Sequence, residues 1–180
     1  MKKIKLLIFA IIIVAVVFRI YINKYQQLVN EGSQIVDEQC LTVNPLIIKR
    51  KQAYIESIKA IQINNDNLFS EANNKYLEYV KQYLVAENKW LEKQYSFMNR
   101  WDFQLFMAKQ AKKLVLWQYK IYLGEYESSD ATLKAYETED KNEREKLTKM
   151  ITKGTNDATK AGEEYNKALE NKNTSFDIRS

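Results

Sequence analysis

The segment that decides the architecture is LLIFAIIIVAVVF, residues 6–18, an unbroken apolar run near the N-terminus. Three lysines among the first five residues precede it, and a long polar chain follows it. Extended to Ile4–Ile22, the segment has about 19 residues and reaches roughly 28 Å as a helix, which matches the hydrocarbon core of a bilayer. We therefore predict a single transmembrane helix over residues 1–22.

A cleaved secretory signal is the competing interpretation of this segment, because signal peptides also combine a basic start with an apolar run. Signal peptidase requires small residues just after the apolar run, whereas residues 17–21 read VFRIY. The sequence therefore favours an uncleaved signal anchor. The only cysteine, Cys40, lies too far beyond the run to carry a lipid anchor.

The charges that flank the anchor predict its orientation. Three lysines and the free amine precede the span, and Arg19 and Lys24 lie in or just after it. The positive-inside rule then places the N-terminus in the cytoplasm and the C-terminal domain outside it, in the periplasm or the extracellular space. The difference in charge is small, so the inverted orientation stays open.

The net charge of +5 belongs to the anchor and not to the rest of the chain. Five of the 28 Lys and Arg residues lie within residues 1–24, which contain no acid, so the remaining 23 basic residues equal the 23 acidic ones. A neutral domain lacks the field that attracts a phosphate backbone. We therefore predict membrane lipid as a partner through the N-terminal helix, and no nucleic acid.

The sequence carries no signature of an enzyme or of a metal or cofactor site. It contains no histidine, which removes the commonest general base and metal ligand. Glu71, Glu78, Glu87 and Glu92 alternate with lysines, a pattern typical of a solvated helix. We predict no catalytic, cofactor-binding or metal-binding residue, and a protein that is not an enzyme. Cys40 is either a buried hydrophobe or half of an intermolecular disulfide.

Four glycines and one proline in 180 residues predict an all-α chain. We expect an antiparallel bundle of three to four long helices over residues 23–170 and a flexible polar tail over 171–180. The anchor helix should break before Pro45, with Asn44 as the N-cap of the next helix, and residues 64–67 (NNDN) should form the next interruption.

The pattern beyond residue 67 predicts a long helix that runs to Leu123, with a kink between Ser96 and Asp102 and an end at Gly124. Residues 128–130 (SSD) are candidate caps for a last helix. That helix carries a row of residues in strict heptad spacing, which should pack against the aromatic-rich long helix: Leu147, Ile151, Gly154, Ala158, Ala161, Tyr165 and Ala168.

Two sets of residues are candidates for function. A lysine face on the predicted helix 103–123 either lies in water or meets anionic headgroups at a membrane surface, and it comprises Lys109, Lys112, Lys113 and Lys120. Aromatic residues suit an interface with a partner, and the candidates are Trp90, Tyr95, Trp101, Trp117, Tyr119 and Tyr122.

An N-terminal span that leads into an all-helical domain resembles the layout of LemA-type bacterial membrane proteins, and residues 165–168 (YNKA) are similar to part of their tail. The domain also resembles the four-helix ligand-binding module of bacterial chemoreceptors, although this chain has no second span. Both resemblances imply architecture only.

These observations predict a non-enzymatic, single-pass envelope membrane protein whose bundle binds another envelope protein or itself. The alternative is a bundle that binds a small apolar or amphipathic ligand, or the membrane surface.

Overall fold

The computed structural model describes the backbone of residues 2–177 and the side chains of residues 11–170. The described chain is almost entirely α-helical and contains no strand. Its helices are α1 (Lys2–Thr42), α2 (Asn44–Gln62), α3 (Asp66–Met98), α4 (Trp101–Phe106), α5 (Lys109–Glu137) and α6 (Lys141–Asp177). The predicted all-α class is confirmed.

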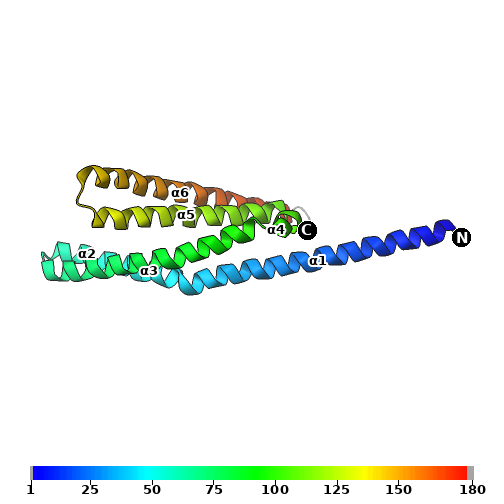
Figure 1. Cartoon of the computed structure of the whole chain (residues 1–180), viewed down its shortest axis with the longest axis horizontal. Coiled ribbons are helices and arrows are strands. Elements are labelled where there is room, and N and C mark those ends of the chain that lie inside the picture. The colour runs from blue at the N-terminus through cyan, green and yellow to red at the C-terminus, as the bar shows by residue number, and fades with distance from the viewer. Residues whose placement is uncertain (1, 178–180) are drawn as a thin grey trace.

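The helices form two antiparallel hairpins and one long helix, α1, that extends beyond them (Figure 1). Hairpins α2–α3 and α5–α6 lie side by side, with both turns at the end of the molecule that is far from the N-terminus, and α3 packs against α5. The second half of α1 packs on α3, whereas its first half extends away alone. This arrangement confirms an N-terminal apolar helix that leads into a helical bundle.

The apolar residues 11–18 of α1 are all exposed. Ile11, Val14 and Phe18 each expose at least 60% of their surface. Among the described helices, one is long and apolar enough to cross a membrane, and almost none of its most apolar stretch is buried inside the protein. Exposed apolar surface of this extent is stable in lipid and unfavourable in water.

The turns between the first helices follow the predicted breakers, with one correction. Pro45 lies in the first turn of α2, where its missing N–H is harmless. The predicted N-cap Asn44 is instead the first residue of α2, because Val43 already has helical dihedrals and its N–H donates to Gln39 O at 2.8 Å. Asn65 caps α3 as expected for its type, and its side chain accepts from Leu68 N at 3.1 Å.

The predicted helix through residue 123 is wrong, because the chain breaks on both sides of the short helix α4. The predicted kink between Ser96 and Asp102 lies at the first break. Phe103 is almost fully buried and packs edge-on against Phe97, with ring centroids 4.9 Å apart. Burying Phe103 requires the chain to turn at this point, and this packing outweighs the helical preference of the local sequence.

The predicted end at Gly124 is also wrong, since α5 continues through it to Glu137. Gly124 faces Gly154 of α6, and a Cβ on Gly124 would lie 2.6 Å from Gly154 O. Glycine therefore permits close helix approach here and does not end the helix. The candidate caps at 128–130 lie inside α5 as well, and the turn to α6 comes at 138–140, where Asp140 Oδ1 accepts from Asn142 N at 2.7 Å.

The heptad row of α6 faces α5. Leu147, Gly154, Ala158, Ala161 and Ala168 are all buried, whereas most other side chains of residues 141–170 are exposed. Small residues on both helices allow their backbones to approach closely. Helix α6 continues to Asp177, whereas residues 178–180 of the predicted tail lie outside the described residues.

The contact between Gly124 and Gly154 makes a first prediction. Gly124→Ala should destabilise the fold by about 1–3 kcal/mol, because the added methyl group overlaps the backbone of α6. The matched control is Gly162→Ala in α6, where an added Cβ meets nothing within 4 Å. That change should stabilise the helix by up to about 1 kcal/mol.

Urea unfolding of the full chain in detergent, followed by circular dichroism, measures both effects. Equal effects of the two substitutions would contradict the close approach of α5 and α6.

Candidate functional site

A column of polar and aromatic side chains runs between α2, α3 and α5, and we call it the polar column: Tyr54, Tyr76 and Tyr136 at its mouth, Arg50, Tyr83 and Ser129 in its middle, and Glu87, Glu125 and Tyr122 at its base. On α5, eleven residues separate Tyr136 from Glu125, so the column is roughly 16 Å deep. It begins near the turns of the two hairpins.

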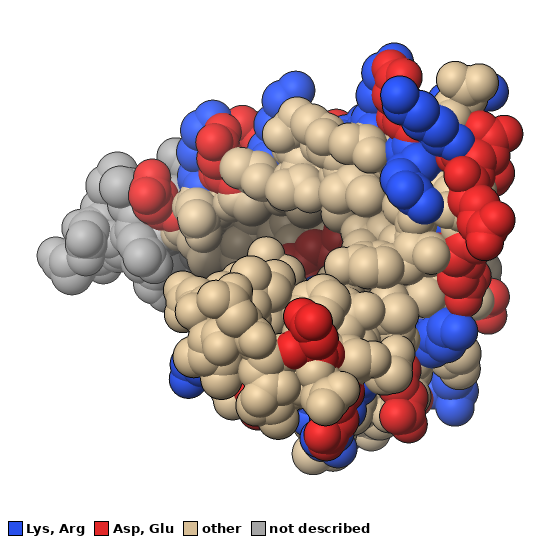
Figure 2. Space-filling model, turned by 90° about the vertical axis from the view of Figure 1, so that its left-hand side faces the viewer, with Lys and Arg blue, Asp and Glu red and all other residues tan. Residues whose placement is uncertain are grey.

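The mouth of the column is aromatic. The ring centroid of Tyr76 lies 5.9 Å from that of Tyr54 and 6.5 Å from that of Tyr136, so side chains of α2, α3 and α5 meet there. Figure 2 views this end of the molecule and shows a hollow with walls of uncharged residues and an acidic surface at its floor. The two hairpins therefore leave an opening between them.

Arg50 occupies the middle of the column. Its guanidinium lies over the ring of Tyr83, 4.4 Å from the ring centroid, and its Nη1 donates to Ser129 Oγ at 2.6 Å. None of the ion pairs among the described side chains includes Arg50. Its positive charge therefore acts through space on Glu87 and Glu125 at the base of the column, where it favours the ionised form of each carboxyl.

The base of the column holds two carboxyl groups. Glu87 is completely buried, and neither of its carboxyl oxygens has a hydrogen-bond partner in the protein. Burial, together with the nearby Glu125, raises its pKa from 4.5 to about 8, although the charge of Arg50 acts in the opposite direction. Burial also raises the pKa of Glu125. Glu87 is therefore mostly protonated at neutral pH.

Tyr83 adds a second unsatisfied group beside Glu87. The side chain is fully buried and its hydroxyl has no partner. Burial raises the pKa of this hydroxyl, so Tyr83 stays neutral and can only donate or accept hydrogen bonds. A buried acid and a buried hydroxyl without partners are unusual in a native core and are typical of functional positions.

Sequence reasoning assigned Glu87 to a solvated face, and the structure corrects this. Val80, Tyr83, Glu87, Trp90 and Gln94 are all buried, at intervals of three or four residues along α3. Glu87 thus continues the buried stripe of the helix, and this spacing was the signal that could have found it. Glu71, Glu78 and Glu92 are exposed, as that assignment requires.

The predicted interface residues do not form one surface. Trp90 is buried, its Nε1 donates to Ile35 O at 2.8 Å, and it packs edge-on against Tyr122. Tyr95 and Trp101 are exposed. Trp117, Tyr119 and Tyr122 are partly buried on α5.

The predicted lysine face begins with α5, because the chain breaks before it. Lys109, Lys113 and Lys120 are exposed. Lys112 turns back and donates to Gln104 O, and Lys120 lies over the ring of Trp117, 4.4 Å from its centroid. The first three lysines are therefore next to α4, whereas Lys120 is part of the contact region of α5 with α6.

Cys40 is exposed and unpaired within the chain. No group of three or more Cys, Asp or Glu side chains able to hold a metal ion occurs in the described part of the chain.

Comparison with protein-family models, curated proteins and solved structures finds no match to this chain.

The raised pKa of Glu87 predicts how stability depends on pH. Below about pH 4.5 the carboxyl is protonated in both the folded and the unfolded chain. Between pH 4.5 and about 8 the unfolded chain loses this proton first, so the free energy of unfolding should fall as pH rises. Glu87→Gln should flatten this decline, because the amide keeps the shape and cannot ionise.

Chemical denaturation at several pH values measures this effect. Glu92→Gln, an exposed substitution on the same helix, is the control and should leave the slope unchanged. The same slope for wild type and Glu87→Gln would show that Glu87 ionises normally in the folded chain.

Proposed function

We propose that this chain is a single-pass envelope membrane protein with a cytoplasmic N-terminus, whose helical bundle outside the cytoplasm is a non-enzymatic module for protein–protein interaction or self-association. The observation that carries the proposal is an exposed apolar stripe on α2, formed by Ile48, Ile55 and Ile58. Its position and composition suit contact with another protein.

The stripe lies along one side of α2. Its residues are separated by seven and three positions, which places them on one helix face. Ile48 exposes 69% of its surface, and Leu41, seven residues earlier on α1, is also exposed. An apolar row of this kind on a helix surface is unfavourable in water, and it is common where a helix packs against a partner.

The membrane placement is supported by α1. The exposed apolar residues 11–18 continue without a break into the packed part of the helix, and the lysines at the N-terminus favour the cytoplasmic side. The neutral charge of the remaining chain suits a protein partner better than a polyanion.

The polar column supports a second candidate function, a binding module for a small amphipathic cation. Glu87 and Glu125 supply two carboxyl groups to one arginine, and the mouth and middle of the column are aromatic. An ammonium group at the base would be balanced by ionisation of Glu87, and aromatic rings attract cations. The notable feature is the absence of any partner for the Glu87 oxygens within the protein.

The proposed orientation predicts the result of a topology experiment. A reporter that folds only outside the cytoplasm, fused after Ser180, should be active in cells. The matched control is the same reporter fused before Met1, which should be inactive. Activity of the N-terminal fusion and not of the C-terminal one would reverse the orientation.

The apolar stripe predicts the effect of a charge on α2. Ile48→Asp should reduce crosslinked complexes of the full chain in its native membrane by at least about fivefold, because a central apolar contact is replaced by a charge. Val85→Asp is the control, since Val85 exposes 76% of its surface and lies on α3. Gel electrophoresis with mass spectrometry of the crosslinked bands distinguishes a second copy from another protein. Equal yields for both variants would contradict a role for the stripe.

A further inference from the structure

Helix α4 lies against α1 at the point where the apolar run ends. Tyr21 Oη donates to Phe106 O at 3.3 Å, and the rings of the two residues lie 5.6 Å apart. Tyr21 is the penultimate residue of the predicted span Ile4–Ile22. A helix that contacts Tyr21 from the side is therefore at the depth of the lipid headgroups if α1 spans a bilayer.

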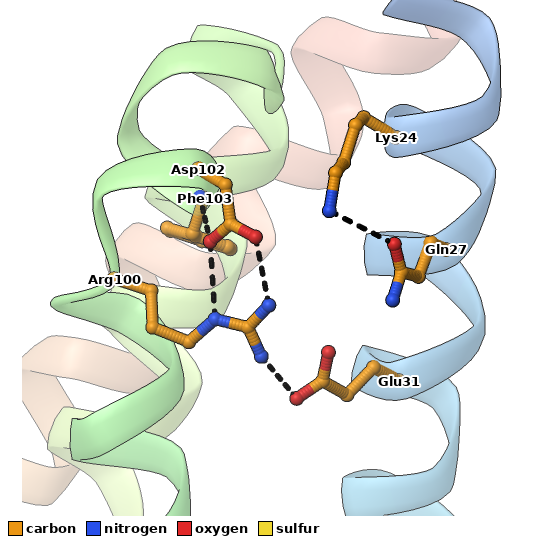
Figure 3. A network of polar contacts seen from close by, with 6 residues as sticks. All are labelled: Lys24, Gln27, Glu31, Arg100, Asp102 and Phe103. Carbon is orange, nitrogen blue, oxygen red and sulfur yellow. Dashed lines mark hydrogen bonds and ion pairs between the residues drawn. The ribbon is translucent and has the colours of Figure 1, made fainter. Parts of the chain in front are cut away.

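An ionic clamp fixes α4 in this place (Figure 3). Arg100 donates from Nε to Asp102 Oδ1 at 3.0 Å and from Nη2 to Asp102 Oδ2 at 2.8 Å, and its Nη1 pairs with Glu31 of α1. Asp102 Oδ1 also accepts from Phe103 N at 2.9 Å. The clamp joins the start of α4 to α1, so α4 cannot easily swing away from the span.

The outer face of α4 is apolar and uncovered. Trp101 exposes 70% of its surface and Leu105 exposes 66%, and their spacing of four residues places them on one side of the helix. The ring of Trp101 lies 6.3 Å from that of Phe106, which itself contacts Tyr21. Tryptophan and tyrosine are the residues most enriched at the boundary between lipid and water.

The charge of this region matches a phosphate surface. No acidic residue occurs between Asp102 and Glu125, whereas Lys109, Lys112 and Lys113 begin α5 directly after α4. The single acid of α4, Asp102, is hydrogen-bonded to Arg100, which lowers its pKa. The region therefore combines an apolar face with nearby positive charge, as interfacial segments do.

We propose that α4 is a second membrane contact of this protein, in which Trp101 and Leu105 enter the bilayer interface while the lysines at the start of α5 meet lipid phosphates. The proposal rests on the single-pass placement proposed above. Its consequence is orientation: with one span and one interfacial contact, the bundle is held with the turns of its two hairpins, and the mouth of the polar column, directed away from the membrane.

The proposal is tested by fluorescence quenching of full-length protein in lipid vesicles. In a Cys40→Ser background, a small environment-sensitive fluorophore is attached to one of three single cysteines: Leu105→Cys on α4, Val85→Cys on α3, or Val14→Cys within the predicted span. The vesicles contain phosphatidylcholine and phosphatidylglycerol, with bromine atoms near the top of the acyl chains in one preparation, for positions 105 and 85, and near the ends of the chains in a second, for position 14. Leu105 and Val85 are similarly exposed, so they form a matched pair.

We expect quenching at position 105 to exceed that at position 85 by about threefold or more, because only α4 lies at the interface. Adding Trp101→Ser should reduce the signal at position 105, whereas adding Val85→Ser should not. Circular dichroism of each variant shows that the helices are retained.

Position 14 separates failure of this proposal from failure of the single-pass placement. Quenching at position 14 together with equal, weak signals at positions 105 and 85 would overturn the contact of α4 and leave the span intact. A lack of quenching at position 14 would overturn the span, and the proposal with it.

Discussion

The continuity of α1 is the constraint on which the rest of the structure depends. One unbroken helix presents an exposed apolar surface over residues 11–18 and then, from Tyr21 onward, becomes a packed member of the bundle. Leu28 lies in a core cluster with Phe97 and Phe103, and Ile35 O accepts from the buried Trp90. Because a helix transmits its direction along its axis, the position of the bundle relative to the anchor is fixed by packing and not by a linker.

This continuity explains why the chain turns between α3 and α5. The antiparallel α3 returns along α1 towards the anchor, and a longer α3 would extend beside the exposed apolar segment of α1. The break at residues 99–100 redirects the chain into α4, and Phe103 fills the core that the turn leaves open. At this turn the guanidinium of Arg100 donates two hydrogen bonds to the carboxylate of Asp102, so the buried carboxylate is paired.

The sequence was sufficient for the fold class and for the elements that depend on local chemistry. Pro45 and Asn65 affect helix starts within one turn of their own position. The heptad spacing of the row on α6 is enough to predict which of its residues face another helix. The failures involve contacts between distant residues. Gly124 is a residue type that often ends helices, and only its close approach to Gly154 shows that it allows α5 and α6 to pack tightly. Glu87 is a residue type usually found in water, and although its spacing places it on the buried stripe of α3, the positions of α2 and α5 are what bury it.

The polar column raises the question of how a bundle tolerates two acids and one arginine in its interior. An isolated buried charge is strongly unfavourable, whereas a neutral carboxyl costs much less. With Glu87 protonated, one of the two acids near Arg50 is neutral, and this sets the balance of charge in the interior. This balance depends on Glu87 keeping its proton, and any event that brings a positive charge to the base of the column favours its release.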